Sequence, residues 1–498
     1  MEKNEALLKE ALSLLPKVKR SRVNVCENAN MGKPMGEHGN ILLDMGRHLT
    51  GYLHLKLGYL GSHPDAPVKL KIHFAERLQE LEEDADGYHG WICSSWIQQE
   101  QIFVDVIPGM VHLPRRYAFR YVRIEVLAIS SKFQLTVDEA YATALTSADE
   151  TALSLYESQD YMLEKMDRVA CHTLRDCMQQ VFEDGPKRDR RLWMGDLRLQ
   201  ALANYETYHM NDMVKGCLYL FAALPMENGQ VGACLFLEPE PEVDDTVMFD
   251  YSLLFIATVW DYYQKTGDKK ALEKLWQTSR RQIDIAEERV DAEGLVKDSD
   301  VLGWCFLDWS LDLNKQAGAQ GVLLYALKNA ICIAETLGLK EEQEILQNKY
   351  DRYRASARKY LWDADNGLFV SGKERQISYA SQIWMILGGA VSTSEGREIL
   401  NRLQKTSGTI GMVTPYLYHH YIQAKLLVGQ KEEALQVMKD YWGAMVELGA
   451  DTFWELFNPK NPDESPYGGT IVNSYCHAWS CAPAYFLRKY FNIGGVSV

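Results

Sequence analysis

The chain has 498 residues, more than one ordinary hydrophobic core serves, so two domains are expected. Its composition is globular, with 47% hydrophobic and 24% charged residues. The net charge of −15 argues against a nucleic-acid partner, because no basic field is available to bind phosphates.

Residues 1–22 predict a short amphipathic helix or arm, since leucines recur at helical spacing. The segment lacks the cationic start, apolar stretch and cleavage site of a signal peptide. No apolar run approaches the roughly 20 residues of a membrane span, so no membrane partner is expected. The ten cysteines show no paired ligand spacing. We therefore expect a cytoplasmic protein with reduced thiols, no metal and no other cofactor.

Residues 23–148 show a strand-like pattern. Apolar and polar residues alternate in several stretches that Gly, Pro and Asp separate, namely 41–45, 51–57, 68–74, 101–107, 121–126 and 133–137. Period-two alternation is typical of strands that bury one face. This segment is predicted to be an antiparallel β-sandwich domain.

Residues 149–498 have a helical period. Gly267, Gly338 and Gly429 stand where helix C-caps are expected, and each precedes a charged first turn. Such connections indicate helical hairpins, while the uneven spacing of the glycines disfavours a short-repeat solenoid. About twelve helices of ordinary length fit this segment. They predict six hairpins that close into an (α/α)6 barrel with a central pocket.

The segment from Asp184 to Asp196 carries the densest chemistry in the chain. It combines three carboxylates, four cations and the indole of Trp193, and a Gly-Pro pair keeps it from being one helix. Carboxylates for proton transfer, cations for hydroxyls and an aromatic face for a ring are typical of a sugar site. Arg188 and Asp189 lie at its centre.

Two of these carboxylates have plainer interpretations. Asp196 precedes an apolar helix, so it is either a helix cap or a first-turn anion that binds hydroxyls. Asp189 is the candidate proton donor, although three neighbouring arginines would lower its pKa if they pointed at it. The alternative is a surface ion-pair cluster. Burial, with the guanidinium groups directed elsewhere, would favour the catalytic role.

Glu455 is the second candidate, because aromatic and apolar residues surround it in sequence, including Trp454. A desolvated carboxylate is either paired or functional. Glycosidic hydrolysis needs two carboxyl groups, and a closed toroid can bring Asp189 and Glu455 face to face. The alternative for Glu455 is a buried ion pair with an arginine.

Five further side chains are candidates for the same pocket, namely Trp304, Asp308, Trp309, Trp454 and His477. Trp304 and Trp309 flank Asp308 in an apolar segment, where they either stack on a sugar or fill the core. His477 lacks a second pair of metal ligands at a matching spacing, so it is interpreted as a hydroxyl-binding side chain.

These motifs resemble glycoside hydrolase family 78, the α-L-rhamnosidases with an (α/α)6 barrel. The Arg-Asp-Arg-Arg-Leu-Trp-Met-Gly-Asp run that ends at Asp196 is similar to the family's acidic motif, and residues 452–455 to its Thr-x-Trp-Glu. Residues 306–309 and the start of the last helix near His477 also look like family segments. The likeness covers about residues 160–495, and residues 42–51 and 120–124 resemble the family's β-sandwich.

The resemblance implies an inverting mechanism in which Asp189 is the acid and Glu455 the base. It places Asp184, Arg188, Trp193 and Asp196 at sugar-binding positions. The chain departs from the family by having Asp for Glu at the acid position. It also lacks the extra β domains of longer members, so the pocket is expected to be open or completed by a second subunit in a homodimer.

The sequence therefore predicts a cytoplasmic exo-glycosidase that removes terminal α-L-rhamnose, or a related deoxy-sugar, from small carbohydrate substrates. A second hypothesis is cleavage of another sugar, or a lyase acting on a rhamnose–uronic acid linkage. In that case Lys187, Arg188, Arg190 and Arg191 would bind the carboxylate. A third hypothesis is a non-catalytic carbohydrate-binding protein.

Overall fold

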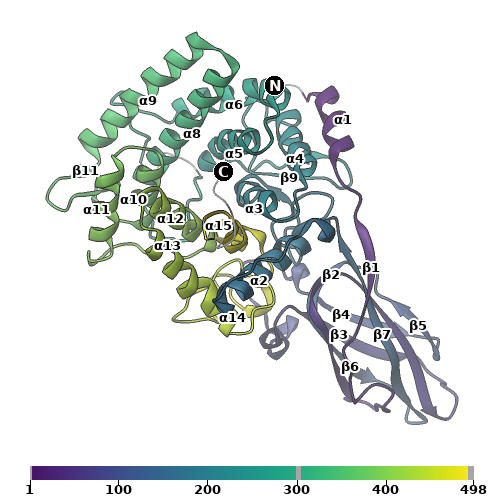
Figure 1. Cartoon of the computed structure of the whole chain (residues 1–498). Helices are drawn as coiled ribbons and strands as arrows, with labels where there is room; N and C mark the ends of the chain where they lie inside the picture. Colours follow the sequence, from purple (N-terminus) through teal and green to yellow (C-terminus); the bar gives the residue numbers. More distant parts are fainter. Residues whose placement is uncertain (1–2, 299–303, 492–498) are drawn as a thin grey trace.

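The computed structural model describes residues 3–298 and 304–491. A β-domain lies beside a larger helical domain, and the chain passes from the first to the second at about residue 150 (Figure 1). The order of an antiparallel β-domain followed by helices is confirmed. Residues 1–2 and 492–498 of the predicted arm and barrel lie outside the described residues.

In the described part of the chain, the β-domain contains a seven-stranded antiparallel sheet of order β1-β7-β2-β6-β3-β4, with β5 paired to β2. The long β2 pairs with β6 through residues 40–51 and with β5 and β7 through its second half. The strands are β1 (Lys19–Asn24), β2 (Asn40–Gly61), β3 (Val68–Ala75), β4 (Gln99–Val104), β5 (Gly109–His112), β6 (Tyr117–Ala128) and β7 (Phe133–Thr146).

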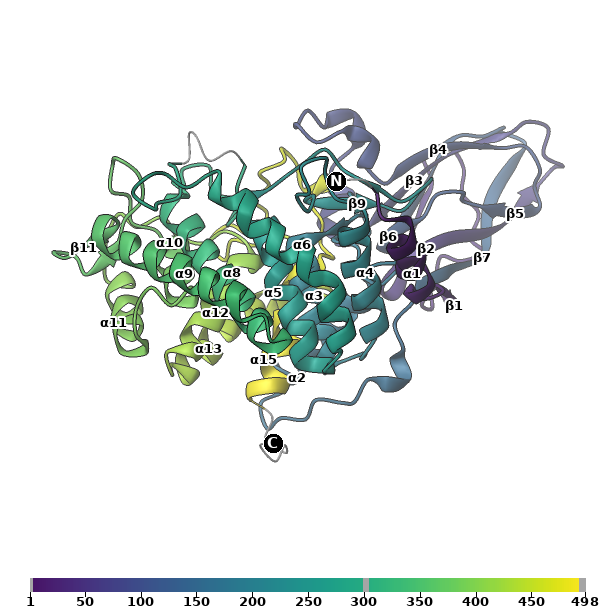
Figure 2. The ribbon, with the colours of Figure 1, turned by 90° about the horizontal axis from the view of Figure 1, so that it is seen from above.

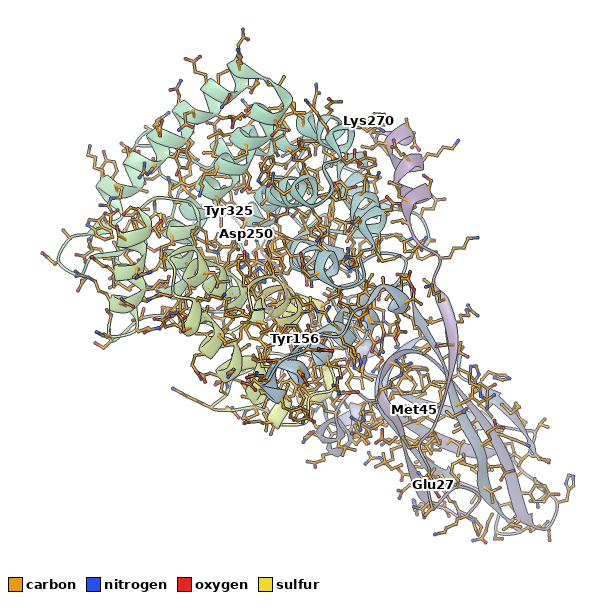
Figure 3. All side chains as sticks on the ribbon, viewed as in Figure 1. Glu27, Met45, Tyr156, Asp250, Lys270 and Tyr325 are labelled. Carbon is orange, nitrogen blue, oxygen red and sulfur yellow. The ribbon has the colours of Figure 1, made fainter. Side chains whose placement is uncertain are left out.

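The alternation seen in the sequence is the alternation of buried and solvent-facing residues in these strands. In β2, Leu53, Leu55 and Leu57 are fully buried and belong to one core with side chains from β3, β6 and β7. Met45 lies inside this domain (Figure 3). Burial of one face therefore fixes the register of the sheet.

The connection from β3 to β4 leaves the sheet and lies against the helical domain. It contains three short 3₁₀ helices, η1 (Leu78–Glu82), η2 (Ala85–Gly87) and η3 (Ser94–Trp96). Tyr88 and Ile97 of this connection share a small hydrophobic cluster with Leu456, Tyr467 and neighbouring residues of the helical domain. The β-domain thus reaches the end of the barrel.

Six helices form an inner ring in the described residues, and each one contacts the next along the chain from α3 to α12, while α15 contacts α3. Most of their residues are buried, and Tyr325 and Asp250 lie in the middle of the domain (Figure 3). The ring consists of α3 (Met194–Glu206), α5 (Phe249–Thr266), α8 (Gln316–Leu337), α10 (Tyr379–Leu387), α12 (Pro415–Leu427) and α15 (Ala482–Tyr490).

Outer helices pack against this ring and expose one face. The predicted six-hairpin arrangement is therefore confirmed for the residues that the structure describes. The outer helices are α2 (Tyr161–Cys177), α4 (Asn211–Ala223), α6 (Lys269–Glu287), α9 (Lys340–Tyr360), α11 (Thr393–Leu403) and α13 (Lys431–Met438), followed by the short α14 (Ala444–Glu447).

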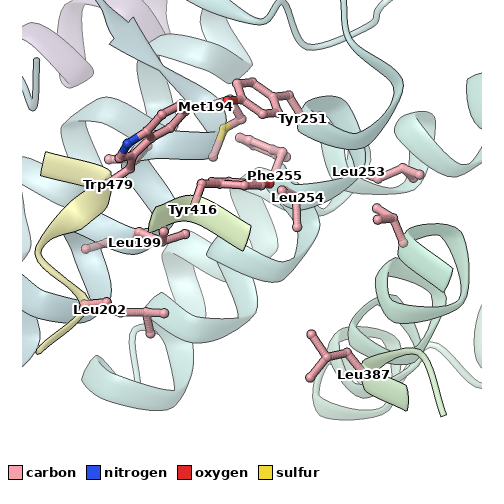
Figure 4. Close-up of a cluster of buried hydrophobic side chains, with 14 of the residues drawn as sticks. Met194, Leu199, Leu202, Tyr251, Leu253, Leu254, Phe255, Leu387, Tyr416 and Trp479 are labelled. Atoms are coloured by element: carbon pink, nitrogen blue, oxygen red, sulfur yellow. The ribbon is translucent and has the colours of Figure 1, made fainter. Parts of the chain in front are cut away.

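The core of the barrel is aromatic near the point where α3, α5 and α12 meet. Tyr251, Phe255 and Tyr416 gather there with Met194 and Trp479 (Figure 4). The predicted helix ends are also confirmed, since Gly267 and Gly338 are left-handed C-caps of α5 and α8. Only glycine adopts this conformation without strain.

By length and composition alone, α8 qualifies as a membrane span. However, 78% of its most apolar window is buried inside the fold, which is the position of an inner helix of the barrel.

Helix α1 (Glu5–Leu14) does not pack on the β-domain that follows it. It lies against α4 in both views (Figures 1 and 2). The approach is close, because a Cβ at Gly216 of α4 would lie 2.9 Å from Leu15. Lys274 of α6 also forms an ion pair with Glu10 at 2.6 Å.

Candidate active site

A cavity of about 300 Å³ opens at the end of the barrel where the inner helices begin. The starts of α3 and α5 and the segments before α8 and α15 supply most of its wall. The predicted residues that line it are Asp184, Arg188, Asp189, Trp193, Asp196, Trp304, Trp309, Glu455 and His477. The two candidate catalytic carboxylates therefore face one cavity.

The backbone of the 184–196 segment has two features that bring its side chains to the cavity wall. A Cβ at Gly185 would lie 2.7 Å from the Ser474 hydroxyl, so the close approach requires glycine. Asp189 and Arg190 both adopt left-handed backbone conformations, with φ of 63° and 56°. Such strain in residues other than glycine is typical of functional turns.

The arginines around Asp189 are directed elsewhere, as the catalytic role requires. Arg190 donates to the carbonyl oxygen of Arg116 at 2.8 Å, and Arg191 donates to Asp244 at 3.0 Å. Arg188 contacts Asp189 only at 3.9 Å and is engaged by Glu455. Asp189 keeps about a third of its side chain exposed, at 30%.

Glu455 is buried, at 4% exposure, and is paired with Arg188 through an ion pair. Its other oxygen accepts a hydrogen bond from the Tyr467 hydroxyl at 2.5 Å. The Glu455 main chain is held by hydrogen bonds with Ser474 and with the Trp479 indole. The predicted alternative, a buried ion pair, is thus present, and the same carboxylate lines the cavity.

The deep end of the cavity is crowded with acids. Asp196 lies in the first turn of α3 and contacts His477 Nε2 at 3.1 Å. Burial raises the pKa of Asp196, and burial with the charges of Asp189 and Asp196 raises the pKa of Asp184. These groups can accept hydrogen bonds from, or donate them to, the hydroxyls of a ring.

Aromatic side chains complete the wall. Trp193 meets Tyr251 edge-on, with ring centroids 6.4 Å apart, and Phe306 stacks on Trp479 at 5.5 Å. Trp309 is half-buried against Phe306. Polar groups on one side and ring faces on another are the features of a pyranose site.

Two predicted site residues do not line the cavity. Asp308 is buried and accepts hydrogen bonds from the amides of Trp309, Val413 and Thr414 and from the Thr414 hydroxyl. Burial raises its pKa to about 6. Asp308 therefore fixes the loop that carries Trp309 instead of facing the cavity.

Trp454 points away from the cavity that its neighbour Glu455 lines. Its ring is buried beneath the guanidinium of Arg77, 4.1 Å from the ring centroid, and contacts Tyr475. Successive residues in this extended segment face opposite sides, so only one of the two can reach the cavity.

Several lining residues were not predicted, namely Trp91, Ile92, Thr246, Met248, Tyr251, Phe306, Tyr467 and Trp479. Trp91 and Ile92 come from the β3–β4 connection, so the chain's own β-domain supplies part of the cavity wall. Two tryptophans, Trp91 and Trp96, in a largely polar stretch are the sequence signal that could have pointed to this connection.

Among the described residues, His48, Asp176 and Cys476 have the spacing of metal ligands and are buried together at the domain junction. Both ring nitrogens of His48 already contact carboxylates, Asp176 at 2.7 Å and Glu76 at 3.1 Å. The acidic partners and the Cys476 thiol raise the pKa of His48 against the effect of burial. His48 is thus held between Asp176 and Glu76 in a buried network at the domain junction.

Comparisons with known proteins agree with this geometry. Residues 11–144 match the glycosyl hydrolase family 78 α-rhamnosidase N-terminal domain. Residues 151–491 match the bacterial α-L-rhamnosidase six-hairpin glycosidase domain. Among curated proteins, none matches the chain.

The chain is 44% identical to a rhamnosidase from Klebsiella oxytoca with rhamnose bound, with a TM-score of 0.94 over 98% of this chain and 99% of that one. Two more distant structures show the fold alone. A family 78 rhamnosidase from Bacillus sp. GL1 has 22% identity and a TM-score of 0.79, over 92% and 47% of the two chains.

The second is an α-L-rhamnosidase from Streptomyces avermitilis complexed with L-rhamnose. It has 16% identity and a TM-score of 0.69, over 95% of this chain and 44% of that one. The matched domains span nearly the whole chain in the same order as the observed fold. The protein is thus a glycoside hydrolase and belongs to family 78, the α-L-rhamnosidases.

Proposed function

We propose that the protein hydrolyses terminal α-L-rhamnosyl residues by a single displacement that inverts the anomeric carbon. The observation that carries this proposal is the placement of Asp189 and Glu455 on one cavity, with Arg188 between them. The family membership and the rhamnose bound to the Klebsiella oxytoca relative support the sugar.

In this mechanism Asp189 protonates the leaving oxygen while Glu455 takes a proton from the attacking water. The ion pair with Arg188 and the hydrogen bond from Tyr467 hold the Glu455 carboxylate in place. Asp184, Asp196 and His477 bind the sugar hydroxyls. Asp189, one methylene shorter than Glu, is carried on a left-handed turn.

Exo action on a small substrate is part of the same proposal. The buried side chains of Asp196, His477 and Trp479 on the cavity wall support it, because they favour a sugar that enters with its free end first. A cytoplasmic location remains part of the proposal, with small imported glycosides as substrates.

A lyase or hydrolase acting on a uronic-acid linkage is not favoured. It requires a free cation for the substrate carboxylate, and the four predicted cations are engaged. Lys187 pairs with Glu80, and Arg188 with Glu455. Arg191 pairs with Asp244, and Arg190 donates to carbonyl oxygens.

A screen of 4-nitrophenyl glycosides tests the proposal, with the anomer of the product followed by NMR. We expect turnover of the α-L-rhamnoside and first release of β-L-rhamnose. First release of the α anomer would contradict inversion, and no turnover of any glycoside would favour a binding protein.

Asp189→Asn and Glu455→Gln separate the two catalytic roles. Loss of acid or base catalysis costs about 10²–10⁴-fold in rate. Asp189→Asn should lose much less kcat on the 4-nitrophenyl rhamnoside than on an alkyl rhamnoside, because nitrophenolate leaves without a proton. Glu455→Gln should lose activity on both substrates alike.

Asp212→Asn, which changes an exposed carboxylate on α4, is the matched control and should retain full activity. Equal losses by Asp189→Asn on the two substrates would exclude Asp189 as the acid.

A further inference from the structure

The mouth of the cavity carries two indoles that water reaches. Trp91 is 65% exposed and Trp304 is 50% exposed, whereas Asp196, His477 and Trp479 at the deep end are no more than 4% exposed. A large aromatic side chain at the mouth of a binding site exposes apolar surface to water. A ligand that covers the ring removes this surface from water, which favours binding.

Trp91 belongs to a row of rings that leads from the mouth to the catalytic base. Its centroid lies 5.5 Å from that of Tyr467, which meets Trp309 edge-on at 6.4 Å. The Tyr467 hydroxyl donates to Glu455 at 2.5 Å. A group attached to the bound sugar would therefore leave the site alongside aromatic faces.

The position of Trp91 is fixed although its ring is exposed. Its indole N–H donates to the Pro466 carbonyl oxygen at 2.9 Å, and the Tyr88 hydroxyl donates to the Tyr467 carbonyl oxygen at 2.7 Å. A Cβ at Gly90 would lie 1.9 Å from the same carbonyl oxygen, so the two segments touch through their backbones. Because the Trp91 side chain is already held in one position, little conformational entropy is lost when it binds a ligand.

The polar side chains near the mouth offer few partners for a second sugar. Arg191 is paired with Asp244. Apart from Asp189, the lining residues that stay partly or fully exposed include Ile92, Thr246, Trp91 and Trp304. A sugar leaving group requires hydrogen-bond partners for several hydroxyls, whereas a flat apolar group requires only ring faces.

We propose that Trp91, carried by the β-domain, forms a wall of the leaving-group site and selects rhamnosides whose leaving alcohol bears an aromatic ring. This inference rests on the proposed function and adds a specificity residue that lies outside the barrel.

Benzyl and ethyl α-L-rhamnoside test it, because both leaving alcohols are primary and similarly acidic, so their rates differ by recognition. Stacking on one ring contributes about 0.5–1.5 kcal/mol, which corresponds to roughly 2- to 12-fold. We expect Trp91→Ala to lower kcat/KM for the benzyl glycoside by about this factor and to leave the ethyl glycoside within about 2-fold.

Trp91→Phe keeps a ring and should retain most of the preference. Phe103→Ala, which removes an equally exposed aromatic side chain from β4, should change neither substrate. Equal losses on both glycosides, or no loss on either, would overturn the assignment of Trp91. If the wild-type protein cleaves neither glycoside, the proposed function itself fails and this inference with it.

Discussion

Asp184 is a buried carboxyl group whose pKa is raised by burial and by two neighbouring carboxylates. It is fully buried, accepts a hydrogen bond from the Arg191 amide at 3.0 Å, and faces the charges of Asp189 and Asp196. A raised pKa in the folded protein means that folding favours the protonated form. The stability from Asp184 is thus present at acid pH and is lost as the pH rises.

Asp184→Asn should therefore stabilise the protein at neutral pH by about 1 kcal/mol, since the amide oxygen can still accept from Arg191. The gain in thermal midpoint should shrink at pH 4. We also expect kcat/KM to fall about 100-fold, because a ligand to the sugar is lost. Thermal unfolding at both pH values checks this, and a lower midpoint at pH 7.5 would show that the charge is stabilising.

The residues of the 184–196 segment could be predicted because their chemistry is contiguous in the sequence. Trp91 and Tyr467 could not, since they join the site only when the β3–β4 connection docks on the barrel. The prediction that Asp308 binds substrate was wrong. Asp308 is next to Trp309 in the sequence, and sequence alone does not tell which of two neighbours faces a cavity and which holds the loop.

At the scale of elements, the 304–309 loop is held by two buried carboxylates. Asp250 at the start of α5 accepts from the amides of Phe306 and Leu307 at 2.9 Å. Asp308 ties the same loop to the start of α12. The loop has no regular secondary structure. The two carboxylates therefore accept the backbone amide hydrogen bonds that a helix or a sheet would otherwise satisfy.

Asp308→Ala should destabilise the protein by about 2–4 kcal/mol, because it leaves buried amide donors without acceptors. The activity of the folded fraction should also fall, since Phe306 and Trp309 lose their support. Urea unfolding measures the first effect and specific activity the second. Asp312→Ala, at an exposed position in the same segment, should be nearly neutral.

Elements with strong periodicity could be predicted from the sequence. The stretches 41–45 and 51–57 proved to be one strand, β2, which continues through an irregularity between Asp44 and Leu49 where Gly46 is left-handed. Strands β1 and β5 were missed. Their residues are largely exposed, so they lack the alternation by which a strand is recognised, and β-pairing with distant partners alone defines them.

At the scale of the whole molecule, buried charges join the two domains. Lys187 of the helical domain pairs with Glu80 of η1, and both side chains are 1% exposed. Arg116 of the β-domain pairs with Glu183 through two hydrogen bonds of 2.9 and 2.8 Å. Burial raises the pKa of Glu80 to about 7, so its ionised form depends on Lys187.

Lys187→Met should lower stability by about 3–5 kcal/mol at pH 8, because it leaves Glu80 buried without its cation. The folded pKa of Glu80 is raised, so its stabilising protonation is complete below about pH 4.5 and is lost as the pH rises through about 7. The defect should accordingly be smaller at pH 5. Adding Glu80→Gln should restore much of the loss, and thermal midpoints of the three variants at both pH values test this.

Helix α1 precedes the β-domain in the chain but packs on α4 of the helical domain. The β-domain is thus anchored to the barrel at both of its ends, through α1 at one and through the 147–160 linker at the other. Two attachments restrict rotation of the β-domain relative to the barrel. We therefore expect substrate to enter and sugar to leave without a movement of the two domains, so that their rates depend on the side chains at the cavity mouth.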